Sequence, residues 1–173
     1  RPKASPVFHA LQYLFGNQTR ENLENFRGYG GAQSYPSRTK DVDDVDFSTG
    51  SVGLGVAQTL FSALVQDYVR AKGWGKERPK GKMVALIGDA ELDEGAVWEA
   101  VLDPMVRELG EITWIVDFNR QSLDRVVPDI SATRLQGLFE AAGWQVVTVK
   151  YGRVLTELFA REGGDALRRR IDT

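Results

Sequence analysis

Two short apolar runs, each ending in polar residues, constrain the fold of this chain more than any other feature. They are Met83–Ile87, followed by Gly88-Asp89, and Ile112–Val116, followed by Asp117-Phe118-Asn119. Apolar runs of this length are typical of strands that are covered on both faces of a parallel sheet. The apolar spacing between the two runs predicts a helix. Pro104 should bend or break this helix, because proline cannot continue a helical hydrogen-bond ladder.

The remaining pattern extends this unit to a fold class. A third strand is predicted at Val146–Val149, after a helix that Gly143 closes. Alternating strands and helices require right-handed crossovers, so we predict an α/β fold with a parallel sheet and helices on both faces. A length of 173 residues suits one domain with a substantial core. We therefore expect residues 1–173 to form a single domain, and we interpret the chain as a fragment of a longer polypeptide.

The N-terminal part contains helices and one long loop. A short helix is predicted after Ser5-Pro6, a second is capped by Thr19, and a longer helix, largely buried, spans Leu54–Ala71. Between them, residues 28–50 show no periodicity, and loops of this length are usually functional or disordered. His9 lies beside core positions, which favours a structural histidine over a metal ligand.

Composition excludes several classes of function. The net charge is −2, the chain has no cysteine, and it has one histidine. Without a basic excess, a nucleic-acid or membrane surface is not indicated. A thiolate metal site is impossible, and a multi-histidine site or a Ser-His relay is disfavoured. No apolar run approaches the length of a membrane span, so a cytoplasmic setting is the default expectation.

The polar residues after the strands indicate a binding edge, because ligands of open parallel sheets bind beyond the carboxyl ends of the strands. The carboxylate of Asp89 and the amide oxygen of Asn119 could share a magnesium ion, which favours oxygen ligands and bridges phosphate oxygens. Two simpler interpretations stay open, with Asp89 as a helix cap and Asn119 as a turn residue. The glycine-rich turn at residues 50–55 either admits a ligand to the backbone or only makes a tight turn. GxGxxG and GxxxxGK[ST] motifs are both absent, which argues against a dinucleotide site or a P-loop.

Several stretches together resemble one enzyme family. They are GDAELDEGAVWEA, WIVDFNRQSLDR, FEAAGWQVVTVKYG, DFSTGSVGLGVA and ENFRGYGGAQSYP. Gly88-Asp89 followed by Asn119, one helix and one strand later, is similar to the signature of thiamine-diphosphate enzymes. The chain resembles the amino-terminal domain of the transketolase-like enzymes, and within them most of all the homodimeric decarboxylase component of the pyruvate dehydrogenase complex. The similarity runs in order from about Ser5 to Gly152.

This resemblance implies thiamine diphosphate and Mg²⁺ as cofactors and gives roles to particular residues. Asp89 matches the magnesium carboxylate, Asn119 the amide ligand, and Gln121 the position whose main-chain carbonyl completes the protein ligands. Gly88 and Ala90 would place backbone groups against the diphosphate.

The resemblance also assigns residues near the rings of the cofactor. Gly53 and Leu54 match a loop beside the aminopyrimidine ring. Glu94 matches an acidic position near the cofactor and the dimer contact, and the alternative is a first-turn glutamate favoured by the helix dipole.

Two positions depart from the family pattern. Ala90 replaces the usual third glycine, which would be strained only if the backbone has a positive φ. Lys3 stands where relatives have a histidine that handles substrate and protons. A lysine is a poor substitute for a group that titrates near neutrality.

The resemblance implies a pyruvate or other 2-oxo acid dehydrogenase decarboxylase component. Two alternatives stay open: a transketolase that transfers two-carbon ketol units between sugar phosphates, and a non-catalytic assembly module of the same fold. The implied partners are a second copy in a homodimer, the remaining domains of the enzyme, and an acyltransferase component of a multienzyme complex. In relatives a glutamate from a second domain activates the aminopyrimidine, so we expect this chain to hold half of each site.

Overall fold

A parallel strand pair forms the centre of the fold. The computed structural model describes residues 5–119, 121–122, 125–126 and 130–172. Strand β1 (Met83–Gly88) pairs in parallel with β2 (Ile112–Asp117), in a register that sets Met83 opposite Ile112 and Gly88 opposite Asp117. Both predicted strands are therefore present, adjacent and one residue longer than the apolar runs. The predicted α/β class with a parallel sheet is confirmed.

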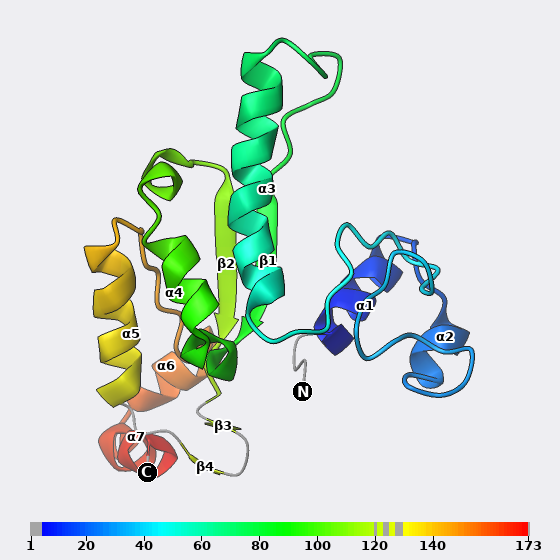
Figure 1. Cartoon of the computed structure of the whole chain (residues 1–173). Helices are drawn as coiled ribbons and strands as arrows, with labels where there is room; N and C mark the ends of the chain where they lie inside the picture. The colour runs from blue at the N-terminus through cyan, green and yellow to red at the C-terminus, as the bar shows by residue number, and fades with distance from the viewer. Residues whose placement is uncertain (1–4, 120, 123–124, 127–129, 173) are drawn as a thin grey trace.

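Three helices cover one face of this sheet. Alternate residues of the two strands, among them Ile87 and Trp114, join a core with α3 (Leu54–Ala71), α4 (Gly95–Val101) and α5 (Ile130–Ala141). Figure 1 shows α3 running along β1 and β2, with α4 and α5 stacked beside it. The ring of Trp114 lies 4.7 Å from that of Trp144 and 5.8 Å from that of Phe139, measured between centroids. This aromatic cluster fixes α5 and the segment after it against the sheet.

The opposite face of the sheet is open. Val84 and Ile115 remain 54% and 52% exposed. Helices α1 (Ser5–Leu14) and α2 (Arg20–Glu24) lie to one side with the long loop, and α1 faces the open side of the sheet across a pocket. Helices therefore lie on both sides of the sheet. Helices α3, α4 and α5 pack directly on one face, whereas the pocket separates α1 from the other face.

The predicted third strand at Val146–Val149 is wrong, because residues 145–150 have no regular secondary structure. Trp144 and Val146 pack against the core, while Val147 and Val149 are exposed. The segment is thus held by side chains rather than by a backbone ladder, and valine favours a strand only where a neighbouring strand is present. Among the described residues, the other strands are β3 (Gln121–Ser122) and β4 (Arg125–Val126), a small antiparallel pair.

Proline divides the helical segment between β1 and β2 as predicted. A short 3₁₀ helix η1 (Asp89–Asp93) precedes α4, and a second one, η2 (Pro104–Glu108), begins at the proline. Helix α3 has the predicted bounds, but it is buried on one face only. Its other face exposes Phe61, Val65 and Tyr68, so the expectation of a largely buried helix is corrected. The chain ends in α6 (Arg153–Phe159) and α7 (Gly164–Asp172).

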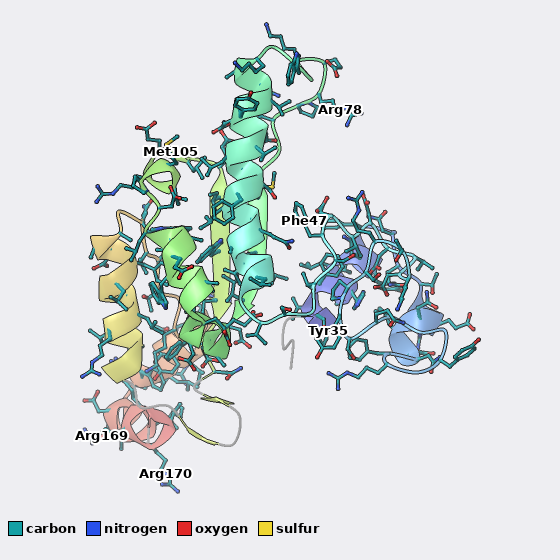
Figure 2. The ribbon with its side chains drawn as sticks, in the orientation of Figure 1. Tyr35, Phe47, Arg78, Met105, Arg169 and Arg170 are labelled. Atoms are coloured by element: carbon teal, nitrogen blue, oxygen red, sulfur yellow. The ribbon has the colours of Figure 1, made fainter. Side chains whose placement is uncertain are left out.

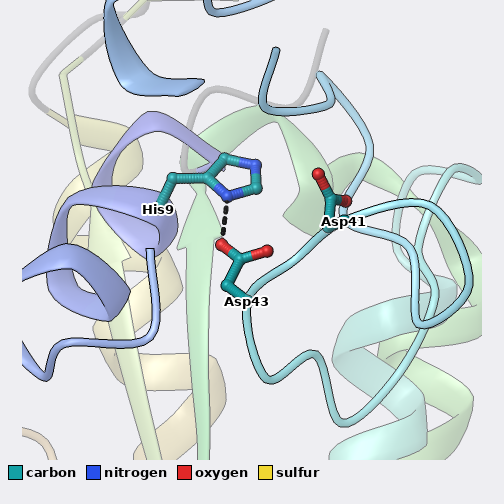
Figure 3. A group of neighbouring side chains, drawn as sticks. All are labelled: His9, Asp41 and Asp43. Atoms are coloured by element: carbon teal, nitrogen blue, oxygen red, sulfur yellow. Dashed lines mark hydrogen bonds and ion pairs between the residues drawn. The ribbon is translucent and has the colours of Figure 1, made fainter. Parts of the chain in front are cut away.

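The long loop is fixed to α1 by a buried network, although it has no helix or strand. Nδ1 of His9 lies 2.5 Å from Oδ2 of Asp43 (Figure 3). Its Nε2 donates to the carbonyl of Gln33 at 2.8 Å. The Asp41 carboxylate accepts the N–H groups of Gln33 and Ser37 at 2.9 and 2.8 Å. His9 is thus the structural histidine that the sequence favoured.

The acidic residues of this loop differ in burial. Asp43 is buried, whereas Asp44 and Asp46 are exposed. His9, Asp41 and Asp43 lie close enough to be considered a metal site. However, both ring nitrogens and both Asp41 oxygens already have hydrogen-bond partners, which is the arrangement of a structural network.

Among the described residues, no helix combines the length and the apolar character needed to cross a membrane.

Figure 2 shows Tyr35 and Phe47 on the side of the N-terminal part that faces α3, and Arg169 and Arg170 on α7 at the other end of the molecule.

Candidate functional site

The predicted metal ligands gather at one edge of the sheet. Gly88 is paired with Asp117, so Asp89 and Asn119 leave the sheet at the same carboxyl edge. Strand β3, which begins with Gln121, lies against η1, which begins with Asp89. The fold therefore brings together the segments of all three predicted magnesium-binding residues, which are η1, the loop after β2 and β3.

Asp89 is a buried carboxylate at this edge. Its residue is 7% exposed, and Oδ1 accepts the N–H of Ala90 at 3.0 Å. The N-cap position of η1 is Gly88, so Asp89 is the first residue of this helix rather than its cap, and its bond to the next N–H is local. A carboxylate is costly to bury unless hydrogen bonds or a cation stabilise its charge, so the same burial also suits a metal ligand.

Asn119 is oriented by an acidic neighbour. Its Nδ2 donates to Oδ2 of Asp117 at 3.1 Å, and both side chains are exposed. The oxygen and nitrogen of an amide lie on opposite sides of the same carbon, so this bond turns the Asn119 oxygen away from the Asp117 carboxylate. A hard cation binds amide oxygen rather than amide nitrogen, and the observed orientation is compatible with that role.

The loop assigned to the aminopyrimidine packs onto the start of α4. Gly53 has φ +80°, and a Cβ atom at this residue would lie 2.8 Å from Cβ of Glu94 and 3.1 Å from Cγ2 of Val97. Gly53 and Leu54 are thus placed beside Glu94, and Leu54 keeps its side chain exposed. Glu94 is the N-cap residue of α4 and is exposed, and its side chain makes no capping hydrogen bond.

The two departures from the family pattern have different outcomes. Ala90 lies inside η1, and the described non-glycine residues with positive φ are Arg27 and Tyr151. The alanine is therefore unstrained. Lys3 lies outside the described residues, so its role stays a prediction.

A pocket of about 480 Å³ includes Glu91 of η1 in its lining. It lies between the open face of the sheet, the N-terminal part and the turn that precedes α3. Its lining includes Phe8, Phe47, Val52, Val84, Glu91 and Ile115. The pocket is mainly apolar, and Glu91 brings a carboxylate into its wall from η1.

Glu91 contacts the turn that contains Asp89, and the sequence interpretation did not single it out. Its Oε2 accepts the N–H of Gly88 at 3.1 Å, across the turn that contains Asp89. The signal was present in the spacing, because a glutamate three residues after the N-cap position is the acidic half of a capping box.

Residues 2–161 match the family described as "Transketolase, thiamine diphosphate binding domain". The chain belongs to this family. Its cofactor is thiamine diphosphate, as the resemblance implied. The family match covers every predicted site residue, including Lys3.

The curated relatives carry two enzyme names. The chain is 32% identical over 98% of its length to the "Pyruvate dehydrogenase E1 component" of Pseudomonas aeruginosa, and 31% identical over 91% to that of Escherichia coli K12. It is also 32% identical over 90% of its length to a "Transketolase" of Streptococcus pyogenes. The chain spans 20%, 18% and 22% of these relatives, so about a fifth of their length.

A solved structure agrees with the fold. A transketolase from Campylobacter jejuni superimposes with a TM-score of 0.71 at 24% identity, over 97% of this chain and 26% of that one. At this identity the similarity establishes the fold alone.

Proposed function

We propose that this chain anchors the diphosphate end of thiamine diphosphate through a magnesium ion held by Asp89, Asn119 and the main-chain carbonyl of Gln121. The observation that carries the proposal is the convergence of Asp89 and Asn119 on one sheet edge, with β3 against η1. These donors are a carboxylate, an amide oxygen and a carbonyl oxygen, which is the ligand chemistry that magnesium favours. The residues therefore fit the cofactor and its metal.

When bound, thiamine diphosphate supplies the electron sink for cleaving a bond next to a carbonyl. The residues of this chain bind and orient it. The absence of a side chain at Gly53 lets the turn before α3 pack against Glu94, which fixes the position of this turn. Leu54 offers an exposed apolar side chain next to the same position.

We propose a 2-oxo acid dehydrogenase decarboxylase component, with pyruvate as substrate, as the enzyme to which this domain contributes. The names of several relatives support this choice. Transketolase is the second candidate, since a relative of that name is equally similar. The two are separated by assaying the full-length protein for carbon dioxide release from pyruvate with a dye acceptor, and for two-carbon transfer between pentose phosphates.

The proposed partners are a second copy of the enzyme, its remaining domains, and an acyltransferase component, in a cytoplasmic setting. The exposed stripe of Phe61, Val65 and Tyr68 on α3 supports a partner surface, because apolar residues at helical spacing usually pack against something. The share of the relatives that this chain spans supports the existence of further domains.

Calorimetry on the full-length protein with thiamine diphosphate and Mg²⁺ tests the proposal. We expect binding that is lost when Mg²⁺ is removed with a chelator. Absence of binding in the presence of Mg²⁺ would refute the anchoring role and would favour a non-catalytic assembly module of the same fold.

A further inference from the structure

The side chain of Glu91 closes the turn that carries Asp89. Gly88 is the last residue of β1 and is buried, and its N–H donates to Oε2 of Glu91 at 3.1 Å. The main-chain carbonyl of Glu91 accepts the N–H of Glu94 at 3.3 Å. Glu91 therefore holds the residue before Asp89 with its side chain and the start of α4 with its backbone.

This bond is well placed to fix the direction of Asp89. Asp89 lies between Gly88 and Glu91 in the chain, so its backbone is enclosed by the ring that the bond closes. Without an acceptor on residue 91, the buried N–H of Gly88 would have no partner in this turn, and such a donor drives the backbone to rearrange. Any rearrangement would move the carboxylate of Asp89, because only one peptide bond separates it from Gly88.

A magnesium site tolerates little movement of this kind. The ion demands near-ideal octahedral geometry with oxygen distances of about 2.0–2.1 Å. Residues that orient a ligand without touching the metal typically change its affinity by about 10–100-fold when they are replaced.

We propose that Glu91 is a positioning residue for the magnesium ligand Asp89. The length of its side chain, rather than its charge, determines whether its oxygen accepts the Gly88 N–H and holds Asp89 in place. This inference rests on the proposed function of Asp89 and adds a residue that the family resemblance did not assign. Glu91 acts through the backbone of Gly88 and is not itself assigned to the metal.

Three substitutions of Glu91 separate the effect of side-chain length from the effect of charge. Glu91→Gln keeps an oxygen at the same distance from the backbone but removes the charge. Glu91→Asp keeps the charge but shortens the side chain by one methylene, so it loses contact with the Gly88 N–H. Glu91→Ala removes both.

The readout is Mn²⁺ affinity in the presence of thiamine diphosphate, followed by the electron paramagnetic resonance signal of free Mn²⁺ in the full-length protein. Mn²⁺ serves as a probe for Mg²⁺ because both favour oxygen ligands. We expect Glu91→Gln to bind within about threefold of the wild type, and Glu91→Asp and Glu91→Ala to bind roughly 10–100-fold more weakly. The opposite order, with Asp retaining affinity and Gln losing it, would overturn the proposal, as would equal affinity in all variants.

Asp103 supplies a matched control for a purely structural cap. Its carboxylate caps η2 by accepting the N–H of Met105 at 2.9 Å, after the C-terminus of α4 and away from the sheet edge. Asp103→Ala should lower thermal stability and leave Mn²⁺ affinity unchanged. A fall in affinity equal to that of Glu91→Ala would show that general loosening is responsible and would refute positioning.

The same titration distinguishes the two proposals. If the wild-type protein binds Mn²⁺ with thiamine diphosphate and Glu91→Asp binds equally well, only the role of Glu91 fails. If the folded wild-type protein does not bind Mn²⁺, the proposed function fails and the role of Glu91 falls with it. Should Glu91→Ala not fold, the pair of Gln and Asp variants decides the question alone.

Discussion

Nδ1 of His9 lies 2.5 Å from Oδ2 of Asp43, with both side chains fully buried. The Nε2 atom must donate to the Gln33 carbonyl, because a carbonyl oxygen only accepts. The other ring nitrogen and the carboxylate are joined by a buried hydrogen bond inside the N-terminal part. The rings of Phe8 and Phe26 lie 5.4 and 6.0 Å from that of His9, and they exclude water from the pair.

The first prediction concerns this pair. Replacing His9 with Ala should lower the free energy of unfolding by roughly 3–5 kcal/mol, because Asp43 would be left buried without its partner. The double variant His9→Ala/Asp43→Ala should lose less than the sum of the two single variants, since each single change already breaks the pair. Urea unfolding followed by circular dichroism measures both. Strict additivity would show that the two residues are not coupled.

Asp89→Ala should abolish the Mg²⁺-dependent binding of thiamine diphosphate while leaving the fold intact. Asn119→Leu should weaken binding less, because a neutral ligand is lost rather than a charged one. Calorimetry on the full-length variants gives both affinities. Asp93→Ala is the matched control, since this exposed aspartate belongs to the same short helix. Unchanged affinity in Asp89→Ala would mean that Asp89 has only a structural role in η1.

Gly53→Ala should destabilise the protein and weaken cofactor binding. An alanine at φ +80° costs roughly 1–2 kcal/mol, and its Cβ would lie 2.8 Å from Cβ of Glu94, which adds a steric cost. Gly95→Ala is the control, because nothing lies within 4 Å of its Cβ position and its φ is not positive. We expect Gly95→Ala to be neutral in thermal denaturation. An equal effect of both variants would argue against the close packing of Gly53 on Glu94.

The sequence predicted those features that depend on local periodicity. The strands at Met83–Gly88 and Ile112–Asp117, the helix Leu54–Ala71 and the break at Pro104 follow from apolar spacing and from the chemistry of proline. Their parallel order then placed Asp89 and Asn119 at one edge. This part of the candidate site could be derived because the carboxyl ends of neighbouring parallel strands share an edge.

The remaining features depend on tertiary partners that no local pattern specifies. The valines at 146–149 have the composition of a strand, yet Val147 and Val149 point to solvent and the segment is held by Trp144. Asp43 and Asp44 are adjacent identical residues, and only the first meets His9. Asp43 is buried because α1 places His9 beside it. The sequence of the loop around Asp43 does not specify where α1 lies.

A charge on the exposed stripe of α3 tests the proposed partner surface. Val65 is 60% exposed, so Val65→Glu should not disturb the core of a single copy. It should weaken self-association of the full-length protein, because a buried carboxylate at an apolar interface is costly. Val147→Glu, at an exposed valine outside the helices, is the control. Sedimentation velocity showing the same oligomeric state for both variants would contradict the prediction.

The last prediction is that residues 1–173 alone will not release carbon dioxide from pyruvate when supplied with thiamine diphosphate and Mg²⁺. The resemblance implies that a carboxylate from a second domain activates the aminopyrimidine, and the described acids near the long loop do not offer a replacement. Asp43 is already paired with His9, and the Asp41 carboxylate accepts two backbone N–H groups.

Asp44 and Asp46 are exposed to water, whereas the activating carboxylate that the resemblance implies comes from a second domain. Glu94 lies beside Gly53, but we assign it to the cofactor and dimer contact rather than to this activation. The purified chain should still bind Mn²⁺ weakly, because Asp89 and Asn119 are both supplied by it. Carbon dioxide release above that of an Asp89→Ala control would overturn the half-site proposal, because the chain would then contain the activating group.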